Sequence, residues 1–167
     1  MKRSKLTVKE TQIVNLSGSI AAGCQPCTRY HINRCKDAGI SDEEIHKIIK
    51  KTEKIWCGAL EEMKLRALKR VLNINNRKLE LHQEADNRHD VLIGIMVSYT
   101  VNSITLFAEY LQSAKKFEIS RNEIFEIIVI SKFIYDKAKA HVDILSEESG
   151  LEKQKIESDN CTPRCGC

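Results

Sequence analysis

Apolar residues recur every three or four positions through most of this chain, and runs that alternate apolar and polar residues are rare. The first twenty residues show the pattern with Val8, Ile13, Val14, Leu16 and Ile20. This spacing is typical of helices that bury one face, and strand signals are weak. Thr7 is placed to cap the first helix and Gly23 to end it, so we expect a helix between them.

The same reasoning divides the rest of the chain into further helices. A second helix is expected from about Pro26, which is tolerated in a first turn, to Gly39, which has the position of a C-terminal cap. Ser41 and Glu44 have the spacing of a capping box at the start of a third helix. Further helices are expected over residues 55–84, as one helix or two, and over 90–101, 104–117 and 120–145. The pattern predicts an all-α fold of six or seven helices.

One sequence pattern occurs twice. The segment ISDEEI at residues 40–45 reappears as ISRNEI at residues 119–124, 79 residues later. We therefore expect two helical repeats, about 1–75 and about 76–157, with the same three helices in the same order. At this shift the equivalent pairs are Cys24 and Ser103, Cys27 and Leu106, and His31 and Tyr110. The second repeat thus lacks the cysteine pair; the alternative is that a common helix-start pattern arose twice.

Composition and charge narrow the class of protein. With 167 residues, two prolines and seven glycines, the chain has the length and usage of one helical domain, which we place at residues 1–157. The net charge of +4 comes from 27 basic and 23 acidic residues that are interleaved, which argues against nucleic-acid binding. The N-terminus lacks the apolar core of a signal peptide, and polar residues interrupt the uncharged segment 91–108. We therefore expect a cytoplasmic protein without a membrane span.

Two cysteines at the start of the second helix carry the candidate chemistry. Cys24 and Cys27 lie where free backbone amides and the positive end of the helix dipole favour a thiolate. His31 follows Cys27 by four residues, one turn along the same helical face, and can exchange a proton with the thiol. This arrangement predicts a redox pair that closes into a disulfide.

A metal site is the alternative for the same residues. Along one helix Cys24 and Cys35 would be about 16 Å apart at ~1.5 Å per residue. No single zinc ion could therefore bind Cys24, Cys27, His31 and Cys35 together, although a three-ligand set completed from elsewhere stays open. Cys35 and Cys57 are expected to be buried packing residues. The histidines that form no recognisable ligand motif are His46, His82, His89 and His141.

The last ten residues, 158–167, have a polar, turn-rich composition and are expected to form a flexible tail. Cys161, Cys165 and Cys167 would be open to oxidation there. Two uses compete for them: carrying electrons to the Cys24–Cys27 disulfide, or binding a soft metal or metalloid such as copper(I), zinc or trivalent arsenic. A disordered tail without a function is the third interpretation.

The strongest similarity to a known family lies in residues 11–45, which read TQIVNLSGSIAAGCQPCTRYHINRCKDAGISDEEI. This segment resembles the core motif of the alkylhydroperoxidase D-like branch of the carboxymuconolactone decarboxylase superfamily. The shared features are an apolar helix ending in Ala-Gly-Cys, the C-x-x-C-x-x-x-H spacing, and a short helix closing in Ala-Gly before Ser-Asp-Glu-Glu-Ile. The resemblance implies an all-helical fold, a homotrimer or homohexamer, and a dithiol that reduces peroxides or exchanges with a partner's disulfide.

The resemblance also implies roles for single residues. In that family the second cysteine, here Cys27, reacts with peroxide, the first, here Cys24, resolves it, and His31 matches the histidine of a proton relay. The family's relay often includes a glutamate twelve residues before the first cysteine, where this chain has Gln12. Gln12 cannot carry a proton, but it can orient His31 or a water by hydrogen bonding.

The expected function is therefore a thiol-dependent peroxidase or disulfide reductase that needs no cofactor and takes electrons from a thiol or dithiol protein. Two other functions stay open. One is a metal- or metalloid-binding redox sensor, and the other is a non-redox decarboxylase of the same superfamily, whose members generally need no C-x-x-C pair.

Overall fold

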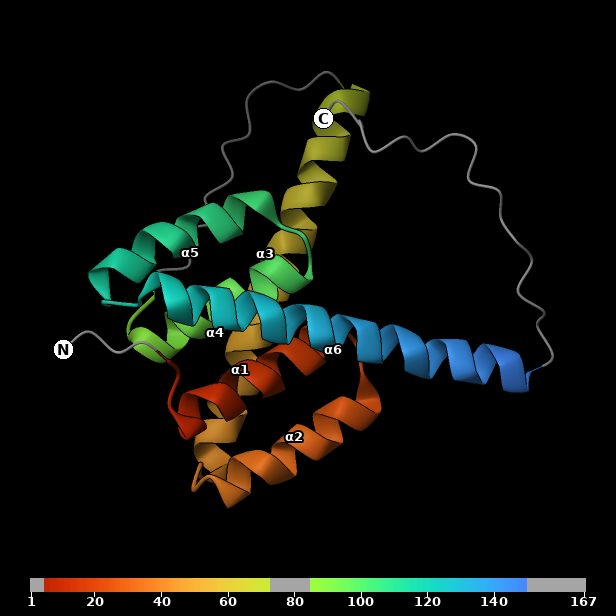
Figure 1. The fold of residues 1–167 in the computed structure, drawn as a ribbon. Helices are drawn as coiled ribbons and strands as arrows, with labels where there is room; N and C mark the ends of the chain where they lie inside the picture. The colour runs from red at the N-terminus through yellow and green to blue at the C-terminus, as the bar shows by residue number, and fades with distance from the viewer. Residues whose placement is uncertain (1–4, 73–84, 150–167) are drawn as a thin grey trace.

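The computed structural model describes residues 5–72 and 85–149, and this part of the chain forms six α-helices (Figure 1). They are α1 (Val8–Ala21), α2 (Gln25–Asp37), α3 (Asp42–Leu72), α4 (Arg88–Thr100), α5 (Ile104–Lys116) and α6 (Arg121–Glu148). No strand occurs among the described residues. The expected all-α fold is confirmed.

Local sequence decides where the helices begin. Thr7 caps α1: its side chain accepts the N–H of Glu10, and the Glu10 carboxylate accepts the N–H of Thr7 at 2.8 Å. Ser41 and Glu44 make the same reciprocal pair of hydrogen bonds at the start of α3, and a further capping box opens α6. These caps satisfy N–H groups that a first helical turn leaves unpaired.

The third helix is longer than the sequence pattern indicated. A helix starting near Ser41 and a separate helix over residues 55–84 were expected, whereas α3 is continuous from Asp42 to Leu72. It contains no proline, and its single glycine, Gly58, is buried inside the helix, so no residue breaks the hydrogen-bond ladder. Residues 73–84 lie outside the described ranges. The described residues therefore hold six helices and not seven.

The two halves repeat each other in structure at the 79-residue shift. Helices α2 and α5 are each 13 residues long and each follow a residue with positive φ, Gly23 at 68° and Asn102 at 57°. The packing is reciprocal, because α1 contacts both α3 and α6 while α4 contacts both α6 and α3. Helices α1 and α4, at equivalent places in the two halves, pack against each other at the centre (Figure 1).

The core lies along these central helices. Helix α4 is buried on nearly all sides, which explains its lack of charge beyond the first turn. Gly18 of α1 lies where a Cβ would come 2.9 Å from Met96 Sδ and 3.1 Å from Ile134 Cδ1, so α1 approaches α4 and α6 closely. This contact holds α6 against the end of α1 that precedes the cysteine pair. Among the described residues, no helix combines the length and the apolar character needed to cross a membrane.

A buried ion cluster also joins the two halves. Arg88 donates to Glu10 at 2.7 Å and to Glu123 at 2.5 Å, and both carboxylate side chains are buried. Burial by itself raises the pKa of Glu10, but hydrogen bonds from Arg88 and Thr7 outweigh it and lower the pKa to about 2. The cluster fixes the starts of α1, α4 and α6 relative to one another.

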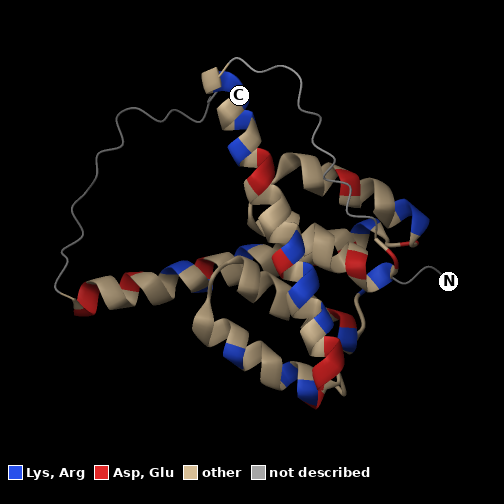
Figure 2. Cartoon of the chain, turned by 180° about the vertical axis from the view of Figure 1, so that it is seen from behind, with Lys and Arg blue, Asp and Glu red and all other residues tan. Residues whose placement is uncertain are grey.

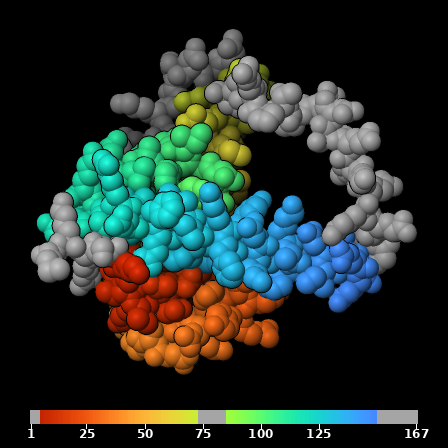
Figure 3. All heavy atoms as spheres, viewed as in Figure 1, coloured from red at the N-terminus to blue at the C-terminus, as the bar shows by residue number. Residues whose placement is uncertain are grey.

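Helices α3 and α6 are exposed along much of their length. Helix α6 crosses one face of the molecule between α5 and α1 (Figure 3), and its C-terminal part extends beyond the body, as does that of α3 (Figure 1). Lysines, arginines and acidic residues are interspersed along these two helices (Figure 2). Large apolar residues are also exposed on them, including Leu60, Met63, Val71, Phe125, Val129, Phe133, Val142 and Leu145.

Candidate functional site

Cys24 and Cys27 lie at the N-terminus of α2 and are joined as a disulfide, with their Cα atoms 5.3 Å apart. Cys24 is the N-cap residue, with extended backbone angles of φ −87° and ψ 98°, and its Sγ accepts the N–H of Cys27 at 3.3 Å. Pro26 occupies the first turn, where its missing N–H costs no helical hydrogen bond. The pair therefore closes within a single helical turn.

The helix start also shapes the reactivity of the two sulfurs. The N–H groups of the first turn and the positive end of the helix dipole lie on the side of Cys24 Sγ, where they stabilise a thiolate. Cys24 is buried and Cys27 is half-buried. Cys27 is thus the sulfur that is more accessible to a reagent from solvent.

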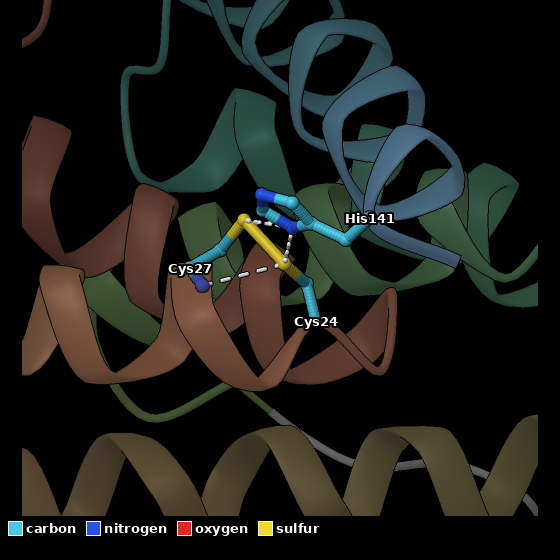
Figure 4. A group of neighbouring side chains, drawn as sticks. All are labelled: Cys24, Cys27 and His141. Carbon is cyan, nitrogen blue, oxygen red and sulfur yellow. Dashed lines mark hydrogen bonds between the residues drawn. A yellow bond between two sulfur atoms is a disulfide. The ribbon is translucent and has the colours of Figure 1, made fainter. Parts of the chain in front are cut away.

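The third member of the site is His141 of α6. Its Nδ1 lies 3.3 Å from Cys24 Sγ and 4.0 Å from Cys27 Sγ (Figure 4). The ring is half-buried and comes from the other half of the chain, 117 residues after Cys24. An imidazole at this place can take a proton from either thiol or return one to it.

The second half of the chain holds a matching arrangement of different side chains. Ser103 caps α5 with φ −83° and ψ 100°, and its Oγ accepts the N–H of Leu106 at 3.4 Å. Glu62 of α3, equivalent to His141 at the 79-residue shift, accepts hydrogen bonds from Ser103 at 3.3 Å and from Thr105 at 2.5 Å. The third helix of each half therefore supplies a polar side chain to the N-terminus of the second helix in the other half.

His31, the expected proton partner, lies one turn beyond Cys27 on α2 and is half-buried. Its Nδ1 is buried and has no hydrogen-bond partner within the described ranges, and its ring meets that of Tyr30 edge-on, with 5.1 Å between centroids. Burial and the nearby charge of Arg34 lower the pKa of His31, so its imidazole is neutral at neutral pH. The imidazole that reaches both sulfurs is that of His141, and a catalytic role for His31 stays a prediction.

Gln12, the other expected relay residue, lies on α1, which packs against α2. Its side-chain Oε1 is buried without a hydrogen-bond partner in the described part of the chain, and its backbone carbonyl accepts from Cys35 Sγ at 3.6 Å. Burial raises the pKa of Cys35 to about 11, so Cys35 is the buried, unreactive thiol that was expected. A role for Gln12 also stays a prediction.

Cys57 does not lie in the core, which corrects the expectation from sequence. It is exposed on α3, and its neighbour Trp56 is 44% exposed. The buried face of α3 is formed instead by residues one turn apart on the opposite side, including Thr52, Ile55 and Ala59. The tail cysteines Cys161, Cys165 and Cys167 lie outside the described residues, so their redox or metal role stays a prediction.

Sequence reasoning missed His141, which had been grouped with the histidines that form no ligand motif. A motif is local, whereas His141 is separated from Cys24 by 117 residues. The internal repeat held a weak signal, because positions 62 and 141 are equivalent at the 79-residue shift and both carry polar side chains.

Comparison with known proteins gave a family match for the first part of the chain. Residues 1–70 match the model of the carboxymuconolactone decarboxylase family. No curated protein and no solved structure matches this chain. The matched segment covers α1, α2 and nearly all of α3, and it includes both Cys24 and Cys27. The resemblance seen in residues 11–45 is therefore confirmed at the level of the family: residues 1–70 carry the sequence pattern of the carboxymuconolactone decarboxylase family.

Proposed function

We propose that the protein is a thiol-dependent peroxidase or disulfide reductase whose redox-active groups are Cys24 and Cys27. The observation that carries this proposal is the disulfide between them at the N-terminus of α2, with His141 Nδ1 at 3.3 Å from Cys24 Sγ. The family match over residues 1–70 supports it.

In the proposed oxidative half-reaction the thiolate of Cys27, the more accessible sulfur, attacks the terminal oxygen of a peroxide. The O–O bond breaks, the alkoxide takes up one proton and leaves as an alcohol, and Cys27 becomes a sulfenic acid. The thiolate of Cys24 then attacks the Cys27 sulfur, the S–S bond forms, the S–O bond breaks and water leaves. The dithiol loses two electrons and the peroxide gains them.

His141 provides the proton transfers that these steps need. Its Nδ1 is within reach of both sulfurs, so it can accept the proton of the attacking thiol and return it to the departing hydroxide. The Cys27 N–H that Cys24 Sγ accepts in the disulfide can equally stabilise the Cys24 thiolate.

The reductive half-reaction needs an external thiol or dithiol donor. A donor thiolate attacks Cys27, the more accessible sulfur, and Cys24 leaves as the thiolate that the helix N-terminus stabilises. A second donor thiol then releases Cys27, so the donor ends as a disulfide and the protein as a dithiol. A protein disulfide can take the place of the peroxide. Cys27 then attacks one of its sulfurs and releases the other as a thiol, and Cys24 attacks Cys27 and releases the second, so the substrate ends as a dithiol and the protein as a disulfide.

The experiment that tests this proposal counts thiols. The fully reduced protein, freed of reductant, is treated with one equivalent of tert-butyl hydroperoxide, alkylated and digested. We expect the loss of two thiols and a cross-linked peptide pair containing Cys24 and Cys27. Unchanged thiols would contradict the proposal and favour the non-redox decarboxylase, for which the cysteine pair is dispensable.

We also propose that the chain self-associates as a homotrimer or homohexamer. Phe125, Val129 and Phe133 recur every four residues along one side of α6 and are at least half exposed, which makes this stripe suited to burial against a second copy. Light scattering should give a multiple of the chain mass that falls when Phe125 and Phe133 are both replaced by Ser. A monomeric mass for the unsubstituted protein would contradict it.

A further inference from the structure

We propose that the reduced cysteine pair and His141 form a binding site for a zinc ion. The ligand atoms are the sulfurs of Cys24 and Cys27 and the Nδ1 of His141, which all lie within 4.8 Å of one another. This inference uses the same dithiol as the proposed function, but binding itself requires no peroxide chemistry.

The distances fit a tetrahedral ion. Zinc–sulfur bonds of about 2.3 Å and zinc–nitrogen bonds of about 2.0 Å place a sulfur and a nitrogen ligand about 3.5 Å apart. The two sulfur-to-Nδ1 distances, 3.3 Å for Cys24 and 4.0 Å for Cys27, lie on either side of that value. Reduction of the disulfide frees the two sulfurs to move apart and admit the ion between them and the imidazole.

The donor set also fits zinc. Two thiolates and one neutral imidazole balance the charge of Zn²⁺, and a Cys₂His set with a fourth position for water or substrate is a known zinc environment. Only Cys24 of the three is buried, while Cys27 and His141 are half-buried, so an ion can enter from solvent. The N–H of Cys27, 3.3 Å from Cys24 Sγ, can stabilise the bound thiolate.

The equivalent place in the other half offers no such site. There the carboxylate of Glu62 is already paired with Arg66 at 2.7 Å and accepts hydrogen bonds from Ser103 and Thr105. The guanidinium of Arg66 and the two hydroxyls thus satisfy the carboxylate of Glu62, the residue equivalent to His141. Of the N-termini of α2 and α5, only that of α2 offers the soft sulfur ligands that zinc prefers.

Zinc binding and dithiol oxidation exclude each other at this site. The disulfide offers no thiolate to the ion, so zinc binds only the reduced protein. When a hydroperoxide oxidises the zinc-bound pair, the two sulfurs lose two electrons and form the S–S bond. The peroxide takes these electrons and two protons from solvent to give an alcohol and water, and Zn²⁺ is released. The site would therefore couple the presence of a peroxide to the release of a metal ion.

The test uses the full chain with Cys161, Cys165 and Cys167 replaced by Ser, so that the tail contributes no thiol. Reduced protein is titrated with Co²⁺ and then with Zn²⁺. We expect one equivalent to bind, with the thiolate-to-cobalt absorption of a tetrahedral site that zinc abolishes. Addition of tert-butyl hydroperoxide should then release the zinc to a chromophoric chelator.

Variants at single histidines identify the third ligand. His141→Ala should weaken zinc binding by roughly tenfold or more, and His141→Cys, which replaces one ligand with another, should restore it. His46→Ala, on the exposed side of α3, is the matched control and should bind as before. Absence of stoichiometric binding by the reduced protein, or binding that is unchanged in His141→Ala, would overturn the proposal.

These outcomes separate the two proposals that share the dithiol. Thiol loss with peroxide but no zinc binding would reject the zinc site alone. Stoichiometric zinc binding that depends on His141 and is not released by peroxide, with thiols unchanged in metal-free protein, would support the site and reject the redox function.

Discussion

Glu62 and His141 occupy equivalent positions, 79 residues apart, and each lies against the N-terminus of the second helix in the other half of the chain. Glu62 accepts from the hydroxyl of Ser103 at 3.3 Å, and His141 Nδ1 lies 3.3 Å from the sulfur of Cys24. One position of the fold thus carries an ion-paired acid in one half and an imidazole beside a disulfide in the other. The two halves have similar backbones at this place and differ chemically because the side chains at the equivalent positions differ.

The first prediction concerns the two cysteines. Cys27→Ser and Cys24→Ser should each abolish peroxide turnover with dithiothreitol as donor, because attack and resolution need different sulfurs. Turnover is followed by the loss of tert-butyl hydroperoxide. Cys57→Ser removes an exposed thiol of α3 and should leave the rate unchanged. Most of the activity persisting in either single variant of the pair would show that another thiol completes the cycle.

The second prediction compares the two histidines. His141→Phe should slow peroxide-driven disulfide formation at neutral pH by roughly 100-fold, since proton transfer to or from the sulfurs is lost. Stopped-flow measurement of thiol loss gives the rate, and added imidazole should restore part of it. His31→Phe should cause the smaller loss, because the imidazole within 4.0 Å of both sulfurs is that of His141. A larger loss in His31→Phe would instead favour the relay that the family resemblance implies.

The third prediction tests the equivalence of the two helix starts. Ser103→Cys combined with Leu106→Cys should form a disulfide, because Ser103 has nearly the backbone angles of Cys24 and caps its helix in the same way. Mass spectrometry after alkylation detects the cross-link. Leu106 is buried, so its truncation should cost about 2–4 kcal/mol of stability, and the Tm should fall. Ser103→Cys alone is the control, and two free thiols in the double variant under oxidising conditions would contradict the prediction.

The fourth prediction concerns stability in acid. The pKa of Glu10 is lowered from 4.5 to about 2 in the folded protein, so its ionised form contributes stability above about pH 4.5 and loses it as the pH falls towards 2. The shift corresponds to at most about 3 kcal/mol. Urea unfolding at a series of pH values should show this loss, and Glu10→Gln should be less stable at neutral pH with a flatter acid limb. Glu53→Gln, at an exposed carboxylate of α3, is the control and should retain the acid limb of the parent.

Much of the fold could be predicted from the sequence because its signals are local. The caps at Thr7 and Ser41 each depend on a hydrogen-bonding side chain three residues away. The continuity of α3 was less predictable, since no residue between Ser41 and Leu72 shows whether a long run of good helix formers makes one helix or two. The exposure of Cys57 could not be predicted from the sequence either, because burial depends on which face of the helix packs against the core.

The sequence by itself determined the pairing of Cys24 and Cys27 at a helix N-terminus, because the spacing, the cap and the proline all act within one turn. It also predicted the repeat, because the pattern at residues 40–45 and its second copy at 119–124 can be aligned without coordinates. Only the tertiary structure decided that His141 joins the pair. That contact depends on α6 being held against the end of α1, where Gly18 lets Ile134 approach closely. Packing of this kind depends on the combined shapes of side chains far apart in the chain, so the spacing of residues within one segment cannot predict it.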